Sequence, residues 1–150
     1  MPVEIAPSEE AMQALVDRIN SGSAYALEVA ATSTDKIDES IEELAALAVD
    51  VATEEEQQLN ETLAVTDRTS HAIRVWIRKK LDQVTPDEVA SLKLVARQIF
   101  QQINNFDSPD GRVRVWECSY DPTEVPSKDA LNTLGLFQAT ILLRVEVEAS

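Results

Sequence analysis

Two segments of the chain alternate between apolar and other residues, and this alternation is the strongest limit on how the chain can fold. Apolar side chains occupy every second position from Phe137 to Val147, and Ile73, Val75 and Ile77 follow the same rule. Successive side chains of a strand point to opposite faces, so each segment predicts a β-strand with one buried face. The C-terminal strand is long, and it could pair with several partners.

Two other segments have the spacing of amphipathic helices. The first begins with Ser8 as its cap, carries apolar residues from Met12 to Ile19 and ends at residues 20–23. The second begins at Thr85-Pro86-Asp87-Glu88, which combines a Thr cap, Pro at the first helical position and a Glu that completes a capping box. Its apolar stripe continues over residues 89–103.

Three further strands are predicted over residues 25–31, 47–52 and 113–120. In the last of these the apolar face changes near Val115 and Trp116, which indicates a β-bulge or a strand covered on both sides. The order helix, three strands, helix, two strands has no βαβ alternation. We therefore expect an α+β fold, with an antiparallel or mixed sheet of about five strands and two helices packed on one face.

The chain of 150 residues fits a single domain over residues 1–150, and its 44% apolar fraction suffices for a core. A polar excursion is expected at about residues 54–70. It is interpreted equally as a solvated loop or helical excursion, or as an arm that touches a neighbouring subunit. The acidic stretch 35–43 indicates a short helical turn or an ordered linker.

The charge balance is strongly acidic, since 13 Lys and Arg face 27 Asp and Glu, for a formal net charge of -14. This charge repels polyphosphate at long range and disfavours duplex binding as the main function, while it favours solubility. Residues 1–5 lack a basic region and a long apolar run, and no segment approaches about 20 apolar residues. Neither a signal peptide nor a membrane span is predicted.

The residues that usually carry chemistry are scarce. Three glycines cannot form a Gly-rich phosphate loop, and a single cysteine excludes an internal disulfide or a thiolate zinc site. His71 is interpreted as a surface histidine at a strand entry, and Cys118 as a small buried hydrophobe. Glu54–Glu56 lacks the Gly turn of a calcium loop. We predict no enzyme, and no catalytic, cofactor or metal site.

A basic strand face around Trp76 is the best candidate binding surface. Such a face could be a nucleic-acid platform, but carboxylates flank it, and Glu146 and Glu148 are available as cross-strand or cross-subunit partners. A subunit interface of complementary charge is therefore favoured, because Trp and Arg dominate interface energetics. The predicted interface residues are Arg74, Trp76, Arg78, Lys80, Arg144, Glu146 and Glu148.

The layout resembles the tail-completion or tail-terminator (neck) proteins of long-tailed bacteriophages and prophages. The resemblance covers nearly the whole chain and depends on the order of elements and on local similarity around residues 44–51 and 73–80. The segments that carry it are Ser40-Ile41-Glu42-Glu43-Leu44-Ala45, Ala48-Val49-Asp50-Val51, Asp67-Arg68 and Ile73-Arg74-Val75-Trp76-Ile77-Arg78-Lys79-Lys80.

The resemblance implies a structural virion protein that is not an enzyme and needs no cofactor. Such proteins form rings, commonly hexamers, that cap the tail tube and join it to the head-side connector. They assemble in the host cytoplasm without a membrane, and DNA passes through the lumen without specific binding. Carboxylates lining the channel would keep DNA from the wall. The segment 54–70 and the last strand would supply contacts between subunits.

Two alternatives belong to other classes of protein. The first is a small acidic inhibitor or nucleic-acid mimic that occupies a basic groove on a host protein. The second is an enzyme whose carboxylates are not marked by any motif.

Overall fold

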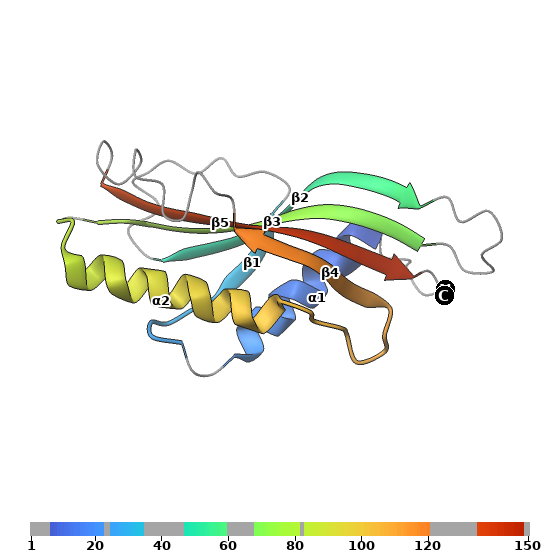
Figure 1. Ribbon diagram of the computed structural model, residues 1–150, viewed down its shortest axis with the longest axis horizontal. Coiled ribbons are helices and arrows are strands. Elements are labelled where there is room, and N and C mark those ends of the chain that lie inside the picture. The colour runs from blue at the N-terminus through green and yellow to red at the C-terminus, as the bar shows by residue number, and fades with distance from the viewer. Residues whose placement is uncertain are drawn as a thin grey trace.

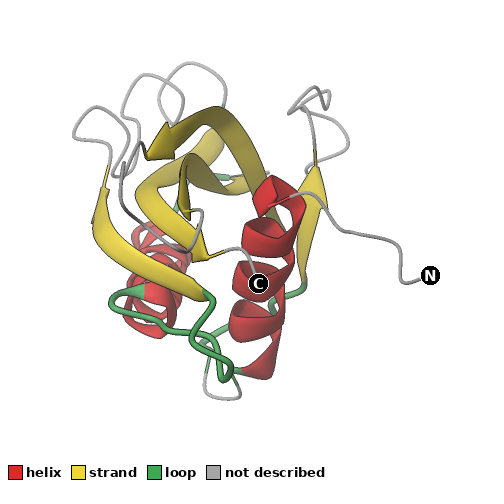
Figure 2. Ribbon diagram, turned by 90° about the vertical axis from the view of Figure 1, so that its right-hand side faces the viewer, coloured by secondary structure: helices red, strands yellow, loops and turns green. Residues whose placement is uncertain are grey.

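In the computed structural model, one five-stranded mixed sheet curves over two helices (Figures 1 and 2). The structure describes residues 7–22, 25–34, 47–59, 68–81, 83–120 and 135–148. The elements, in chain order, are α1 (Pro7–Ser21), β1 (Ala31–Thr34), β2 (Ala48–Leu59), β3 (Arg68–Lys80), α2 (Pro86–Ile103), β4 (Val113–Tyr120) and β5 (Leu136–Glu148). The predicted α+β class and the predicted element order are confirmed.

The two strands with the clearest alternation, β3 and β5, lie side by side at the centre of the sheet. The strand order is β1-β2-β3-β5-β4, in which β1 and β2 are parallel and every other pair is antiparallel. β3 and β5 pair without a break from Arg68 opposite Glu148 to Lys80 opposite Leu136. This ladder joins segments that are far apart in the sequence.

The predicted polar excursion over 54–70 is wrong at both ends, because residues 54–59 belong to β2 and residues 68–70 to β3. β2 has a register shift between Thr53 and Glu55 and then pairs with β3 as far as Leu59 opposite Arg68. Pairing with β3 holds this polar segment as a strand. Residues 60–67, the acidic stretch 35–43 and the segment Ser40–Ala45 lie outside the described residues.

The first strand exists, but its predicted bounds of 25–31 are wrong, since β1 begins only at Ala31 and runs to Thr34. Hydrogen bonds to both helices hold this segment and the start of β1 instead. Asn20 Oδ1 accepts a hydrogen bond from the Ala31 N–H at 2.7 Å, and Gln98 Oε1 accepts one from the Ala26 N–H at 2.8 Å. The Tyr25 hydroxyl donates to the Ile19 carbonyl at 2.7 Å.

The core lies between the helices and the sheet face that they cover. Its largest fully buried side chains come from both helices and from the central strands: Leu15, Ile19, Ile73, Ile77, Leu92, Ile99, Ile103, Phe137 and Ile141. The alternation in β3 and β5 supplies the sheet side of this core, as expected. The Thr85 hydroxyl caps α2 by accepting a hydrogen bond from the Glu88 N–H at 3.4 Å.

The bulge expected in β4 is confirmed. Its pairing with β5 shifts register between Val115 and Glu117, which leaves Trp116 half-exposed at the bulge. No helix within the described residues is long and apolar enough to cross a membrane.

Shortening a core side chain tests the assigned sheet face. Ile141 is fully buried on β5, so Ile141→Ala is expected to lower the free energy of unfolding by about 2–5 kcal/mol. Val84 is 49% exposed, and Val84→Ala is expected to change that energy by no more than about 0.5 kcal/mol. Urea unfolding of both variants measures the difference. Equal losses would contradict the assignment of Ile141 to the core.

Candidate functional site

The sheet face turned away from the helices carries the predicted interface residues. Ile73, Val75 and Ile77 are buried in the core, so Arg74 and Trp76 project to the opposite face. The Arg74 guanidinium carbon lies 5.8 Å from the centre of the Trp76 ring. These two neighbours on one strand form a cation–π contact.

The register separates Arg74, Arg78 and Lys80 of β3 from the carboxylates of β5. Arg78 lies opposite Gln138, whereas Glu146 and Glu148 lie opposite Ser70 and Arg68. Positions 70 and 78 are about 26 Å apart along a strand. The cross-strand pairing considered for these groups is therefore not formed within the chain, and their role between subunits stays a prediction.

Arg78 has an acidic partner on β2 that the sequence did not suggest. Its Nη2 lies 3.1 Å from Oδ2 of Asp50, and the two side chains are only 8% and 7% exposed. Asp50 Oδ1 also accepts a hydrogen bond from the Thr32 hydroxyl at 3.1 Å. The buried pair links β2 to β3, and Thr32 extends it to β1. The sequence feature that could have indicated this pair is Asp50, a single carboxylate between Val49 and Val51.

The other predicted residues lie around two polar hollows or at the end of a strand. Arg74 and Arg144 line a hollow of about 240 Å³ together with Glu117. Glu146 and Glu148 follow Arg144 at the C-terminal end of β5 and line a smaller hollow of about 90 Å³ with Arg112 and Arg114. Lys80, the last residue of β3, is half-buried. The seven residues thus share one sheet but do not form one continuous cluster.

His71 is fully buried, so its predicted surface position is wrong. β3 begins at Arg68, earlier than expected, which places His71 in phase with Ile73 and on the core side. Its Nε2 lies 2.7 Å from the Thr69 hydroxyl. Among the residues that the structure describes, no group of three or more His, Cys, Asp or Glu side chains could hold a metal ion.

Cys118 lies on β4 and packs against the core as a half-buried side chain, which fits its interpretation as a small hydrophobe. Burial disfavours the thiolate and raises the pKa of the thiol to about 12. At neutral pH the group is therefore held in its unreactive protonated form.

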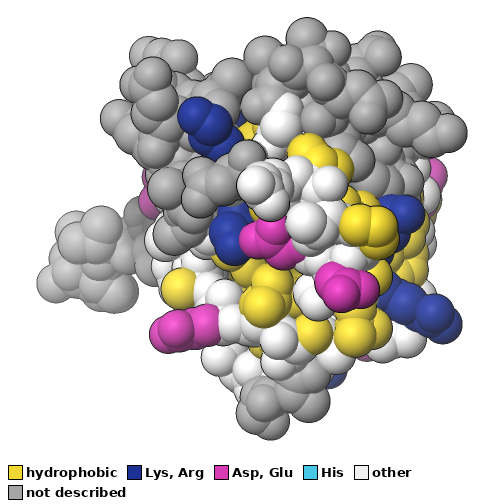
Figure 3. All heavy atoms as spheres, turned by 90° about the vertical axis from the view of Figure 1, so that its left-hand side faces the viewer, with side chains coloured by type: hydrophobic (Ala, Val, Ile, Leu, Met, Phe, Trp, Pro, Cys, Tyr) yellow, Lys and Arg dark blue, Asp and Glu magenta, His cyan; other side chains and the backbone are white. Residues whose placement is uncertain are grey.

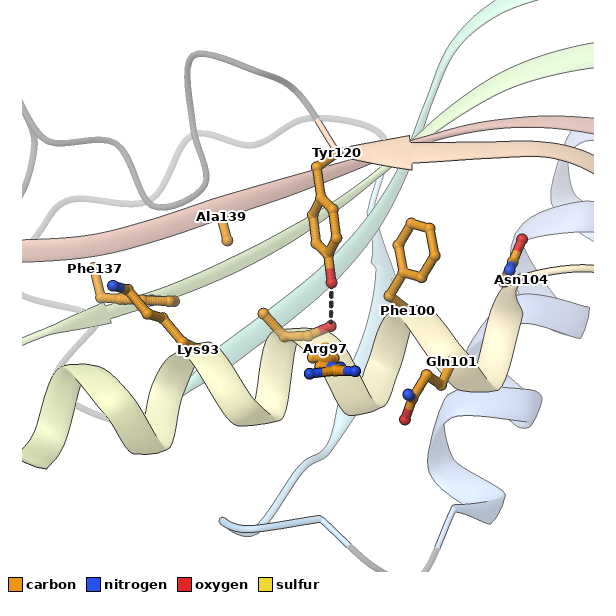
Figure 4. A pocket seen from close by; sticks show the side chains of 9 residues that line it. Lys93, Arg97, Phe100, Gln101, Asn104, Tyr120, Phe137 and Ala139 are labelled. Carbon is orange, nitrogen blue, oxygen red and sulfur yellow. Dashed lines mark hydrogen bonds between the residues drawn. The ribbon is translucent and has the colours of Figure 1, made fainter.

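A groove of about 510 Å³ lies between α2 and the strands β4 and β5 (Figure 4). Tyr120 stacks on Phe100 with 4.6 Å between ring centres, and its hydroxyl donates a hydrogen bond to the Ala96 carbonyl at 3.4 Å. Burial raises the pKa of Tyr120, which keeps this donor protonated at neutral pH. Lys93 and Arg97 of α2 also line the groove.

A second groove, of about 560 Å³, separates α1 from the turn between α2 and β4; we call it the α1 groove. Its residues combine apolar surface with carboxylates, and the main ones are Glu10, Ala14, Asp17, Phe106, Pro109 and Asp110. Neither groove was predicted, because each arises where elements distant in the sequence pack together. Figure 3 shows the end face nearest the start of α2, where hydrophobic side chains lie among charges of both signs.

No family model matches the chain, and no curated protein matches it in sequence. What the described surfaces offer is paired charge and apolar grooves. These are the means by which one macromolecule contacts another.

Removing the charge of Asp50 tests the buried pair. Asp50→Asn leaves the Arg78 guanidinium buried without its counter-charge, and we expect a loss of about 3–5 kcal/mol in the free energy of unfolding. Asp107 pairs with Arg114 at the surface, with side chains 53% and 64% exposed, so Asp107→Asn is expected to cost less than about 1 kcal/mol. Denaturant unfolding compares the two. A ranking in the other order would rule out a structural role for the buried pair.

The thiol of Cys118 gives a test that depends on pH. Burial raises the pKa of the thiol from its usual 9.0 to about 12, so the folded state favours the protonated form. The contribution of this preference to the stability of the fold is complete below pH 9 and is lost as pH rises toward 12. At pH 8 we expect a disulfide reagent to react at least about a hundredfold more slowly with the folded chain than with the chain in urea. Comparable rates would show that the thiol is accessible and ionised normally.

Proposed function

We propose that this chain is a structural protein of a phage-type tail, which assembles as a ring at the upper end of the tail tube and joins the tube to the head-side connector. The observation that carries the proposal is the fold. Two helices cover one face of a single sheet, in the element order α-β-β-β-α-β-β on which the resemblance to tail-completion and tail-terminator proteins depends.

The outer half of β2 supports a role in assembly. β1 pairs only with residues 49–52 of β2, so within the described residues Glu55–Leu59 has a strand partner on one side alone. An edge of this kind is a surface on which another chain can pair.

The acidity of the chain suits a ring through which DNA passes. A net charge of -14 on each copy would multiply in a ring, and carboxylates that face the lumen would prevent DNA from adhering to the wall. The ring's proposed partners are therefore other copies of the chain, the tail tube and the connector, with DNA present in the lumen but not bound specifically.

The proposal is tested by the state of assembly. Light scattering after size-exclusion chromatography is expected to give a ring of about six subunits, the size that the resemblance to tail-completion and tail-terminator proteins implies. If the free chain is monomeric, negative-stain microscopy with tail tubes is expected to show rings at one end of each tube. A chain that stays monomeric at micromolar concentration and leaves the tubes uncapped would overturn the proposal. That outcome would favour the acidic inhibitor instead.

A further inference from the structure

The exposed side of α2 is positively charged, although the chain as a whole is strongly acidic. Between Glu88 and Asp107 there is no carboxylate, and the charged residues are Lys93 and Arg97. Both are exposed, and Leu94 beside them is 47% exposed. These three residues, which we call the α2 ridge, present an apolar side chain flanked by two cations.

The α1 groove has the complementary character. Ala14, Phe106 and Pro109 supply apolar walls, and exposed carboxylates come from Asp17 and Asp110. Asp17 accepts a hydrogen bond from Gln13 Nε2 at 2.8 Å. Hydrogen bonds from the Ser108 hydroxyl and the Arg112 N–H lower the pKa of Asp110 and keep it ionised.

The cations at the α1 groove are already engaged within the chain. Arg18 donates from Nε to the Gln102 carbonyl at 2.8 Å, and its guanidinium carbon lies 5.3 Å from the centre of the Phe106 ring. Arg112 pairs with Glu10, with 3.0 Å between Nη1 and Oε1. The groove therefore offers Asp17 and Asp110 to a cationic partner.

The α2 ridge of one copy cannot enter the α1 groove of the same copy. The C-terminal end of α2 already borders this groove through Gln102, which contacts Arg18. Arg97 and Lys93 lie about 8–14 Å back along the same helix axis, on a rigid element. The ridge can meet a groove of this kind only on another molecule.

We infer that the α1 groove receives the α2 ridge of a second copy of this chain. An exposed helix side with one apolar anchor is the shape that an apolar groove accepts, and the cations of the ridge match the carboxylates of the groove. Because the contact joins two different surfaces, it is heterologous and repeats from copy to copy, and it forms a ring where the rotation between neighbouring copies closes. The inference rests on the proposed ring and names the surfaces that would form it.

Charge reversal on each surface tests the contact. The ridge variant is K93E/R97E, and the groove variant is Q13K/D17K, which changes two exposed positions of α1 that line the groove. Each variant alone places like charges across every contact, so each is expected to raise the concentration needed for assembly at least about tenfold. In an equimolar mixture, copies of the two variants can alternate, so that an acidic ridge meets a basic groove and a basic ridge meets an acidic groove. The concentration needed for assembly is then expected to return to within about threefold of the wild-type value.

Glu28→Lys serves as the control, because Glu28 is an exposed residue between α1 and β1 that lines neither groove. We expect it to assemble as the wild type does. Sedimentation velocity gives the concentration dependence in solution, and co-sedimentation with tail tubes replaces it if the wild type assembles only there. Far-ultraviolet circular dichroism and urea midpoints show that each variant is folded.

The outcomes separate this inference from the proposed function. If the wild type assembles but neither reversal matters, the ridge–groove contact is overturned and the ring stands. The same conclusion follows if the mixture does not recover, or if Glu28→Lys is as damaging as the ridge variant. If the wild type neither assembles nor caps tubes, the ring itself is overturned.

Discussion

The pairing of β3 with β5 is the constraint on which the rest of the structure depends. Both strands have 13 residues, and they pair along their whole length although α2 and β4 separate them in the sequence. A slip of one residue would turn the apolar face of one strand outward, so the shared core fixes the register. β2 and β4 then add to the two sides of this central pair, and both helices cover the face that it makes apolar.

The opposite face of the sheet uses a different kind of interaction to hold its strands in place. Asp50 of β2 lies opposite Trp76 of β3, two residues from Arg78, and both charged side chains are nearly inaccessible to solvent. A buried ion pair contributes little net stability once desolvation is counted, but it strongly disfavours arrangements that leave one charge alone. Together with the Thr32 hydrogen bond, it favours a single alignment of β1, β2 and β3.

The sequence predicted the elements whose signals are local and missed those whose cause is distant. The capping box at Thr85–Glu88 and the alternation from Phe137 to Val147 indicated α2 and β5 without any knowledge of their neighbours. Residues 25–30 have strand-like alternation, yet Gln98 of α2 takes one of their backbone donors and the strand does not form. Residues 54–59 show no apolar pattern, yet β3 pairs with them. The residues of either segment do not reveal which helix or strand will lie beside it in the fold.

The same distinction explains what the sequence could say about the candidate site. The charge of Arg78 and its position on the outer face of β3 led to its prediction as a residue of a subunit interface, and that role stays a prediction. Its buried partner Asp50 became apparent only through the β2–β3 register. The α1 groove could not be predicted from the sequence either, because α1 and the turn at Phe106–Asp110 are far apart in the sequence.

The charge pattern has a consequence for how copies of such a chain would meet. At a net charge of -14, two copies repel each other in most orientations, and at physiological ionic strength this repulsion decays over about 8 Å. An approach that leads with Lys93 and Arg97 toward Asp17 and Asp110 reverses the sign locally, so the orientation that leads to contact is the one least opposed. Repulsion between the acidic surfaces of the two copies disfavours the other orientations. An acidic chain with one cationic helix side is thus better suited to an ordered, directional assembly than a neutral chain with the same apolar surface.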